Sequence, residues 1–406
     1  MLRKKRPLLI AAALCVLLIL AVAGGWITLH ERNSASESNH ESSEIPNYSP
    51  DPSPSALPSA SPVPRETRAK ITLSAVGDIL IHDSVYKDAY KKGQGKTYHF
   101  DPMFARVKSL MEQADITFAN QESIAGGAEI GLSSYPMFNS PFQISDTLQQ
   151  AGVDIVSMAN NHTLDRKEQA ILNAIGYYEK IGLPYVGAYK DEEDRNKIRV
   201  LEKNGVKVAF LAFTYGTNGL TAPQGKEYLV NYIDKDRIRQ EISKAKQQAD
   251  VVVLSLHFGI EYQMNPNEEQ KELAKFAVKK GADIILGHHP HVLQPAEWVE
   301  REDGTKGFVV YSLGNFLAAQ KELDTLIGGI LTLHIEKIER GDKISISIQN
   351  PSFIPTYISY KNWREYSVIP MDQLTNRDLQ GIEQKREQVK GHMAKWMPDL
   401  AFPPSG

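Results

Sequence analysis

Cysteine is almost absent from this sequence. Its single cysteine, Cys15, lies within an apolar run near the N-terminus. One cysteine cannot form a disulfide within the chain, and it cannot supply the cluster of thiolates that binds structural zinc. Any metal site in this chain must therefore use histidine, carboxylate, amide or water ligands.

The chain also lacks an excess of positive charge. Its 46 lysines and arginines and its 49 aspartates and glutamates give a formal net charge of −3. Residues 3–6 contribute +4 to this balance, which leaves −7 for residues 7–406. Binding to a phosphate backbone needs clustered positive charge. We therefore expect no nucleic-acid partner.

One long apolar run is present, and it predicts on which side of the cell membrane the protein is located. Residues 8–29 are apolar apart from Thr28 and follow four basic residues. A run of ~20 residues spans a bilayer as a helix, and basic residues stay on the cytoplasmic side. Residues 1–30 are therefore predicted to be a basic cytoplasmic stub and a single-pass anchor in the cell membrane, with the C-terminal domain extracytoplasmic.

Two alternatives for the N-terminus also lead to export. Ala21-Val22-Ala23 before Gly24 fits a signal-peptide cleavage site, and cleavage after Ala23 would make the protein secreted. A lipoprotein modified at Cys15 is less favoured, because Leu14 is large and the apolar run continues past it.

Serine and proline dominate the next stretch. Residues 33–64 contain ten serines and seven prolines. Such a composition has too little apolar surface to offset the entropy of ordering, and its prolines favour extended conformations. Residues 31–69 are therefore predicted to be a disordered linker that separates a folded domain from the membrane.

From residue 70 onward, short apolar runs alternate with segments of helical periodicity. This alternation predicts an α/β fold in which buried strands are covered by helices. The strands are expected at 71–76, 116–119, 153–158, 185–187, 206–213, 251–256, 284–286 and 308–312. The helices are expected at 103–113, 144–151, 166–181, 235–248 and 267–280.

The pattern weakens near residue 320. Residues 70–320 are predicted to form the main domain, and residues 321–406 a C-terminal extension that packs on it. Within the extension we expect strands at 329–338 and 344–348, joined by a hairpin, and a charged helix at 372–396.

Polar side chains of the kinds that bind metals follow the ends of these strands. They are Asp78, Glu122, Asn161, His162, His257, His289, His291 and Asn315. The carboxyl ends of parallel strands meet at one edge of a sheet, where the ligands of α/β proteins bind. The sequence therefore predicts that these residues converge on one site.

The sharpest of these signals is the run Gly287-His288-His289-Pro290-His291, with three imidazoles in four residues. Asp78 taken alone is more typical of a turn or a helix cap, and His257 taken alone is more typical of a buried histidine bonded to the backbone. Together the residues offer oxygen and nitrogen ligands that suit a divalent transition metal, Mn²⁺ or Zn²⁺, as one or two ions. Such ions support hydrolysis, and His162 is a candidate general acid because imidazole titrates near neutral pH.

Six motifs occur in order along residues 71–318: Ser74-Ala75-Val76-Gly77-Asp78-Ile79, Asn120-Gln121-Glu122-Ser123, Ala159-Asn160-Asn161-His162-Thr163-Leu164-Asp165, Leu256-His257-Phe258-Gly259-Ile260-Glu261-Tyr262, Gly287-His288-His289-Pro290-His291-Val292-Leu293-Gln294-Pro295 and Tyr311-Ser312-Leu313-Gly314-Asn315-Phe316. This series resembles that of the CapA family of poly-γ-glutamate capsule proteins. The resemblance implies a four-layer αββα sandwich of the metallophosphoesterase type. It also implies an extracellular role beside membrane-bound poly-γ-glutamate synthetase and export subunits, acting on poly-γ-glutamate or another envelope polymer.

The resemblance also implies roles for individual residues. Those in the places of metal ligands are Asp78, Glu122, Asn161, His257, His289 and His291. The candidate catalytic residues are Asn161, His162 and Asp165. Further candidates for the site are His82, Asn120, His288 and Asn315.

Two positions depart from the metallophosphoesterase pattern. Leu80 stands where that pattern has a histidine, and His82 is the only histidine nearby. Glu122 follows Asn120 in an Asn-x-Glu context where the pattern usually has Gly-Asp. Which of the tandem histidines accompanies His291 stays open, and so does a site with a single ion.

Three functions are compatible with these observations. The favoured one is a membrane-anchored capsule synthesis or export protein with a metal-dependent, hydrolase-like site. A second is a non-enzymatic accessory subunit of a membrane synthetase that uses metal only structurally. The third is a metallophosphoesterase that acts on another envelope substrate.

Overall fold

The computed structural model describes residues 66–406. The predicted membrane anchor and nearly all of the predicted linker lie outside the described residues. The folded part begins with a strand at Glu66, so residues 66–69 belong to the domain and not to the linker. None of the helices within residues 66–406 is long and apolar enough to cross a membrane.

The described chain alternates strands and helices. The strands are β1 (Glu66–Ile79), β2 (Ile116–Asn120), β3 (Ile155–Ser157), β4 (Tyr185–Val186), β5 (Arg199–Lys203), β6 (Val206–Thr214), β7 (Val251–His257), β8 (Ile284–His288), β9 (Leu293–Glu300), β10 (Lys306–Leu313), β11 (Asn315–Leu317), β12 (Ile327–Arg340), β13 (Lys343–Lys361) and β14 (Arg364–Pro370). The helices are α1 (Asp83–Lys92), α2 (Asp101–Phe104), α3 (Lys108–Glu112), α4 (Gln143–Gln150), α5 (Lys167–Ile181), α6 (Glu192–Asn196), α7 (Lys235–Lys246), α8 (Glu268–Lys279) and α9 (Ile382–Met393).

The strands form two sheets. In the first, the order is β14-β13-β12-β1-β2-β3-β4, and β11 also pairs with β1. Here β1 to β4 run parallel, whereas β12 pairs with β1 in the antiparallel sense. In the second, the order is β5-β6-β7-β8-β10-β9, with β6, β7, β8 and β10 parallel. The parallel strands of each sheet therefore end at a common carboxyl edge.

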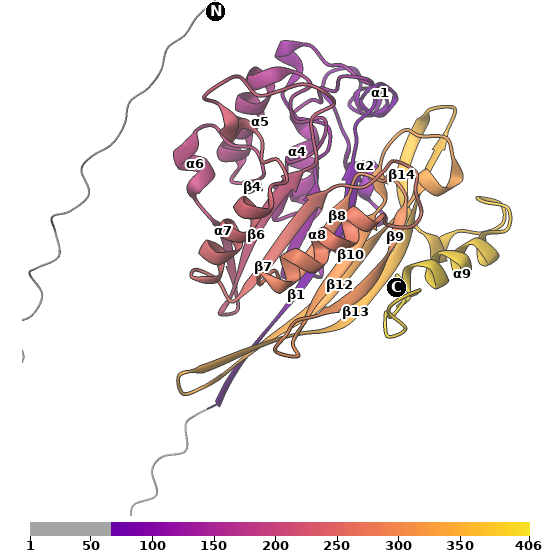
Figure 1. Ribbon diagram of the computed structural model, residues 1–406. Helices are drawn as coiled ribbons and strands as arrows, with labels where there is room; N and C mark the ends of the chain where they lie inside the picture. Colours follow the sequence, from indigo (N-terminus) through magenta and orange to yellow (C-terminus); the bar gives the residue numbers. More distant parts are fainter. Residues whose placement is uncertain (1–65) are drawn as a thin grey trace, which may run out of the picture. The chain divides into compact units, whose positions relative to one another are not determined.

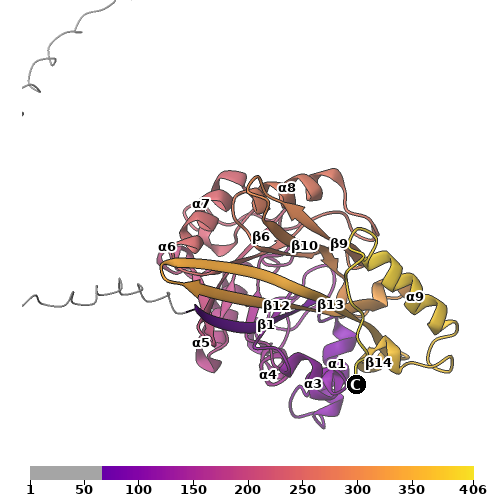
Figure 2. The ribbon, with the colours of Figure 1, turned by 90° about the horizontal axis from the view of Figure 1, so that it is seen from below.

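The two sheets pack face to face, with helices on their outer sides (Figures 1 and 2). Along β6, Val208 and Phe210 enter the core between the sheets, whereas Ala209 and Leu211 join the core beneath α7 and α8. Successive side chains of a strand point to opposite faces, so one apolar run serves two cores. Burial of Phe210, which stacks on Phe118 of the first sheet, stabilises the fold by about 1.5–3 kcal/mol. With α1, α4 and α5 covering the first sheet, the layers are α/β/β/α.

Residues 321–406 are part of this sandwich. β12 pairs with β1 along most of the length of β1, and the predicted hairpin joins β12 to β13. Leu331 and Leu333 of β12 and Met393 of α9 contribute to the core between the sheets. The sequence predicts an extension packed on a main domain, and in the structure the extension supplies three strands of the first sheet.

Several elements differ from the predicted ones. The helix expected at 103–113 is split into α2 and α3. The helix expected at 372–396 is reduced to α9, because Gly381, with φ at 76°, adopts a left-handed conformation where the helix begins. The apolar patterns of the sequence do not include α1, α6, β5, β9, β11 and β14.

Candidate metal centre

Strand pairing brings the predicted site residues to one edge of both sheets. On the first sheet, Asp78 of β1 is the register partner of Asn120 on β2 and of Asn315 on β11. On the second sheet, His257 of β7 is paired with His288 of β8. All five side chains are fully buried. The carboxyl ends of the central strands therefore build the floor of one site.

Two sets of possible metal ligands meet at Glu122. In the first set, one ligand atom from each of Glu122, His257 and His289 lies within 4.8 Å of the others. In the second set, Glu122 is joined within the same distance by Asp78 and His291. Glu122 Oε1 is 3.6 Å from Nε2 of His257 and 3.6 Å from Nε2 of His291. The geometry thus offers two neighbouring ion positions that share the Glu122 carboxylate.

Several of these buried ligand atoms lack hydrogen-bond partners within the described part of the chain, as expected of atoms that bind a cation. Both carboxylate oxygens of Glu122 and Nδ1 of His289 are buried without a hydrogen-bond partner among residues 66–406. Burying a charged group without a partner is costly, and buried polar groups in folded proteins are nearly always paired. Carboxylate oxygens together with imidazole nitrogens are ligands of divalent transition metals. The residues present therefore fit a divalent metal ion.

Two asparagines stand beside the ligands. Asn120 donates a hydrogen bond through Nδ2 to Asp78 Oδ1 at 2.8 Å, which fixes the orientation of that carboxylate. Asn161 Oδ1 lies 2.9 Å from His257 Nε2. The amide oxygen of Asn161 and the imidazole of His257 thus point to the same place, so both are available to one ion.

His291 is oriented by Asn315. Asn315 Oδ1 lies 3.0 Å from His291 Nδ1, while its Nδ2 donates to the carbonyl of Thr325. A hydrogen bond at one ring nitrogen fixes the tautomer and leaves the other nitrogen free for metal. His289 and His291 have φ values of 98° and 57°, so the chain holds a strained backbone where it directs these two imidazoles into the site.

The buried charges shift the pKa values of these groups in opposite directions. Burial opposes protonation of His291, but the negative charges of Glu122 and Asp78 prevail and raise its pKa to about 10. Burial raises the pKa of Glu122 well above its ordinary value. Burial lowers the pKa of His257 well below its ordinary value and lowers that of His289 to about 3. His257 and His289 are therefore neutral, whereas a metal ion must compete with a proton at His291.

His162 is held beside the ligand sets by Asp165. Nδ1 of His162 lies 2.7 Å from Oδ2 of Asp165, and the same oxygen accepts a hydrogen bond from the Phe138 backbone N–H at 2.7 Å. The Phe138 ring packs edge-on against the imidazole, with 4.7 Å between ring centroids. His162 follows Asn161 in the chain, whose Oδ1 lies 2.9 Å from Nε2 of the ligand candidate His257. Asp165 therefore positions His162 and leaves its Nε2 available as an acid.

His82 lies apart from the ligand sets. Its Nδ1 accepts a hydrogen bond from the Ala319 backbone N–H at 3.2 Å, and its ring packs edge-on against Phe138 at 5.1 Å. Burial lowers its pKa to about 4. His82 belongs to none of the ligand sets among the described residues, so it does not take the place of the histidine that is missing at Leu80, whose side chain is buried.

The structure also separates the two tandem histidines. His289 belongs to a ligand set with Glu122, whereas His288 lies behind Asp78, with its Nδ1 3.5 Å from Asp78 Oδ1. The His288 ring is fully buried and tilts against the ring of Phe118 at 5.9 Å. His289 is therefore the partner of His291 in the site.

Three residues of the site are not among the predicted ones. Glu261 forms a third ligand set with His289 and His291, within 4.8 Å, although Glu261 is exposed. Tyr215 packs against His289 at 4.6 Å, and Tyr262 lies 6.2 Å from His291. All three stand on loops after β6 and β7, where strand periodicity carries no information. The one signal for Glu261 and Tyr262 is their place in the motif that follows β7.

Comparison with solved structures finds similar chains at low identity. The NAD nucleotidase NadN of Haemophilus influenzae is similar over 83% of this chain, at 12% sequence identity and a TM-score of 0.43. The match covers 57% of that protein, so this chain spans little more than half of its length.

Comparison with protein families and curated sequences is more specific. The chain is 31% identical over 274 residues to the PGA biosynthesis protein CapA of Bacillus subtilis (strain 168), a match that covers 66% of this chain and 68% of that protein. It is 27% identical over 383 residues to the capsule biosynthesis protein CapA of Bacillus anthracis, covering 91% of this chain and 83% of that protein. The model of the family described as bacterial capsule synthesis protein PGA_cap matches residues 72–320. The chain therefore belongs to this family, and the resemblance to CapA proteins read from its six motifs is confirmed.

Proposed function

We propose that this chain is a membrane-anchored, extracytoplasmic protein of poly-γ-glutamate capsule synthesis or export, and that its metal centre hydrolyses a bond of its substrate. The observation that carries the proposal is the Glu122 carboxylate, buried between two sets of ligands without a hydrogen-bond partner among the described residues. A structural carboxylate would be paired, so the arrangement is best explained by cations that bind there. Mn²⁺ and Zn²⁺ suit the mixture of oxygen and nitrogen ligands.

The same residues support hydrolysis as the reaction. A divalent cation in this position supplies Lewis acidity and lowers the pKa of water. Asn120 and Asn315 hold Asp78 and His291 in fixed orientations, so the ligand sets are preorganised. His162, oriented by Asp165, is placed to give a proton to the leaving group. This division of roles is the one expected of a metallophosphoesterase-type αββα sandwich.

The proposed partners are inferred from the names of the relatives and from the predicted membrane anchor at the N-terminus. Relatives are named for capsule biosynthesis and for PGA biosynthesis. The basic stub and apolar run of residues 1–30 support an anchor that keeps the domain at the outer face of the cell membrane. We therefore infer that the protein works beside membrane-bound synthetase or export subunits.

The test begins with metal content. Full-length protein is purified in detergent, and its bound metals are measured by elemental analysis for wild type, His291→Ala and a matched control, His334→Ala, which removes an exposed imidazole on β12. Bound transition metal that drops in His291→Ala and not in His334→Ala supports the site. Equal, metal-free wild type and His291→Ala proteins would remove the catalytic proposal.

The second arm measures turnover. The Mn²⁺-loaded protein is assayed on generic phosphoesters and on poly-γ-glutamate, with His257→Ala as the inactive reference. Cleavage of the polymer supports the proposal. Metal without any turnover points instead to a non-enzymatic accessory subunit, and turnover of phosphoesters alone points to a phosphoesterase that acts on another envelope substrate.

A further inference from the structure

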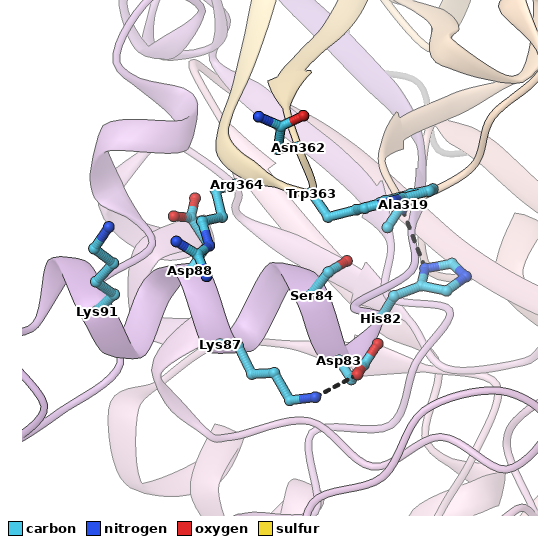
Figure 3. Close-up of a pocket in the computed structure, with 10 residues that line it drawn as sticks. All are labelled: His82, Asp83, Ser84, Lys87, Asp88, Lys91, Ala319, Asn362, Trp363 and Arg364. Atoms are coloured by element: carbon cyan, nitrogen blue, oxygen red, sulfur yellow. Dashed lines mark hydrogen bonds and ion pairs between the residues drawn. The ribbon is translucent and has the colours of Figure 1, made fainter.

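We propose that a cavity beside the metal centre binds a carboxylate-rich polyanionic chain and leads it toward His162. This inference rests on the proposed function and assigns a place to its substrate. The cavity has a volume of about 810 Å³ and lies between α1 and the turn that joins β13 to β14 (Figure 3). This volume is in the upper part of the range for ligand sites, so the cavity has room for several units of a polymer.

Cations line both walls of this cavity. Lys87 and Lys91 lie one helical turn apart on α1, and Arg364 stands across the cavity at the start of β14. Side chains four residues apart on a helix are neighbours on one face, with about 5–6 Å between Cβ atoms. Within residues 66–406, neither Lys91 nor Arg364 forms an ion pair. Lys91 and Arg364 are therefore two unpaired cations of the described chain that face one cavity, which fits a ligand with repeated negative charges.

The acidic residues of the cavity cancel only part of this charge, that of Lys87. Asp83 pairs with Lys87 at 2.5 Å, and Asp88 pairs with Lys92 at 2.7 Å. Asp88 is buried as well. Both carboxylates are thus already neutralised by lysines of α1, and the charge left for a ligand is positive.

The turn between β13 and β14 adds apolar and amide groups. The indole of Trp363 is 38% exposed and stacks on Tyr360 at 4.9 Å. Lys321 lies over the Trp363 ring at 5.9 Å and brings a further cation to this wall. Asn362 lines the cavity with a side-chain amide. A polymer of acidic units joined by amides presents methylene groups, amides and carboxylates, and each has a partner here.

One end of the cavity lies on the side of the candidate acid His162. His82 and Ala319 line it there and are joined by a hydrogen bond, whereas Lys91 lies at the other end of α1 (Figure 3). The ring of His82 packs on Phe138, and Phe138 packs on His162. The rings of His82 and Phe138 therefore separate a chain bound along α1 from the candidate acid His162.

The experiment measures binding of fluorescently labelled poly-γ-glutamate to the full-length protein in detergent, by fluorescence polarisation, with and without Mn²⁺. Lys91→Glu and Arg364→Glu are each expected to weaken binding about tenfold, and the double variant more. Lys279→Glu is the matched control, because Lys279 is also an exposed lysine in the last turn of a helix but lies on α8, over the second sheet. It should bind as wild type does, and the fully amidated, uncharged polymer should not bind.

A second readout follows the intrinsic fluorescence of Trp363. Polymer is expected to change the tryptophan emission of wild type, and Trp363→Phe should remove most of that change while metal content stays at the wild-type level. Unchanged affinity in the Lys91→Glu/Arg364→Glu double variant, or no binding to wild type, would overturn the proposal. Full displacement of the polymer by an equal concentration of inorganic phosphate would also overturn it, since the cavity would then take a single anion.

The outcomes separate this inference from the proposed function. Charge-dependent binding by a protein that holds no metal and cleaves nothing supports the cavity and contradicts the hydrolase. Metal-dependent turnover that is insensitive to Lys91 and Arg364, measured at low polymer concentration, supports the hydrolase and contradicts the cavity.

Discussion

At the scale of single residues, the centre depends on how Glu122 is accommodated. Its carboxylate is fully buried, and burial raises its pKa well above the ordinary value. The nearest counter-charge is on His291, whose own pKa is raised to about 10 by Glu122 and Asp78. Without metal, the charges of Asp78, Glu122 and His291 stabilise one another. A cation bound at the same place would take over the role of the proton on His291.

A substitution at Glu122 separates its role as a ligand from its effect on stability. Glu122→Gln keeps the shape and removes the charge that both ligand sets share, so we expect the bound metal to fall by at least half. Chelator should lower the stability of wild type more than that of the variant, because a folded protein that holds less metal has less binding energy to lose. Elemental analysis and thermal unfolding with and without chelator measure the two effects. Glu129→Gln, an exposed glutamate, is the control. Undiminished metal in Glu122→Gln would contradict a shared ligand.

The raised pKa of His291 predicts how metal binding depends on pH. Its folded pKa, about 10, lies above the ordinary value of 6.5, so the imidazole is protonated at neutral pH and must release its proton before it binds metal. Affinity for Mn²⁺ should therefore rise between about pH 6 and pH 9. His257 and His289, whose pKa values are lowered, add nothing to this dependence in that range.

Calorimetric titration measures this release directly. With Mn²⁺ added in buffers of different ionisation enthalpy, the apparent binding enthalpy should change with the buffer, since protons leave the protein. In His291→Gln the proton release should shrink, and the remaining affinity should depend less on pH. A wild-type affinity that is flat over the same pH range would contradict the charge state proposed for His291.

At the scale of elements, the site depends on two strand ends whose backbones lie too close together for a side chain to fit between them. A Cβ atom on Gly77 would lie 1.9 Å from the backbone oxygen of Gly314 and 2.8 Å from that of Leu313. This contact brings the end of β1 against the connection between β10 and β11, where Asp78 N–H donates to the Gly314 carbonyl at 2.9 Å. The glycine is therefore needed so that Asp78 and Asn315 stand side by side.

Gly77→Ala should consequently lower stability, by about 1–3 kcal/mol, because the backbone of two strands must move apart. Gly176→Ala is the matched control, since Gly176 lies within α5 and a Cβ atom there meets no neighbouring atom within 4 Å. That substitution should raise stability by about 0.5–1 kcal/mol through helix propensity. Denaturant unfolding compares both with wild type, and equal stability of the two variants would contradict the packing argument.

The same scale explains which elements the sequence could predict. Strands such as β2, β6 and β7 are continuous apolar runs, because both of their faces are covered, and they were expected nearly at their observed bounds. The edge strands β5 and β9 and the short helix α6 have little apolar periodicity, since only part of each is buried. These elements depend on contacts with segments distant in the chain, and the local sequence pattern gives no information about such contacts.

The site was predictable to a similar extent. His257, the last residue of β7, is fixed by the common carboxyl edge, so its place in the site follows from the strand pattern. Glu261 and Tyr215 reach the same place from loops, and their positions depend on the path of the loop. The sequence also left the tandem histidines undecided, because only the left-handed turn at His289 determines which ring enters the site.

At the scale of the whole molecule, the centre belongs to the junction of two sheets. Asp78 and Glu122 come from the first sheet, whereas His257 and His291 follow strands of the second. Both ligand sets that contain Glu122 draw residues from the two sheets, whereas the set of Glu261, His289 and His291 comes from the second sheet alone. The geometry of the centre therefore depends on how firmly the sheets pack, and β12 is central to that packing since it lies beside β1.

This dependence predicts that residues 70–320 do not suffice for the fold, although they contain every candidate ligand. Ending the chain at residue 320 removes Leu331, Leu333 and Ile335, which are almost completely buried between the sheets. Their burial contributes roughly 5–9 kcal/mol in total, which is comparable with the whole stability of a typical domain, about 5–15 kcal/mol. It also leaves β1 without its antiparallel neighbour. The truncated protein should therefore lose cooperative unfolding, protection from proteolysis and bound metal together, as measured by circular dichroism, limited digestion and elemental analysis. A truncated protein that stays protected and keeps its metal would show instead that the ligand sets form without the C-terminal strands, and that residues 321–406 serve another purpose.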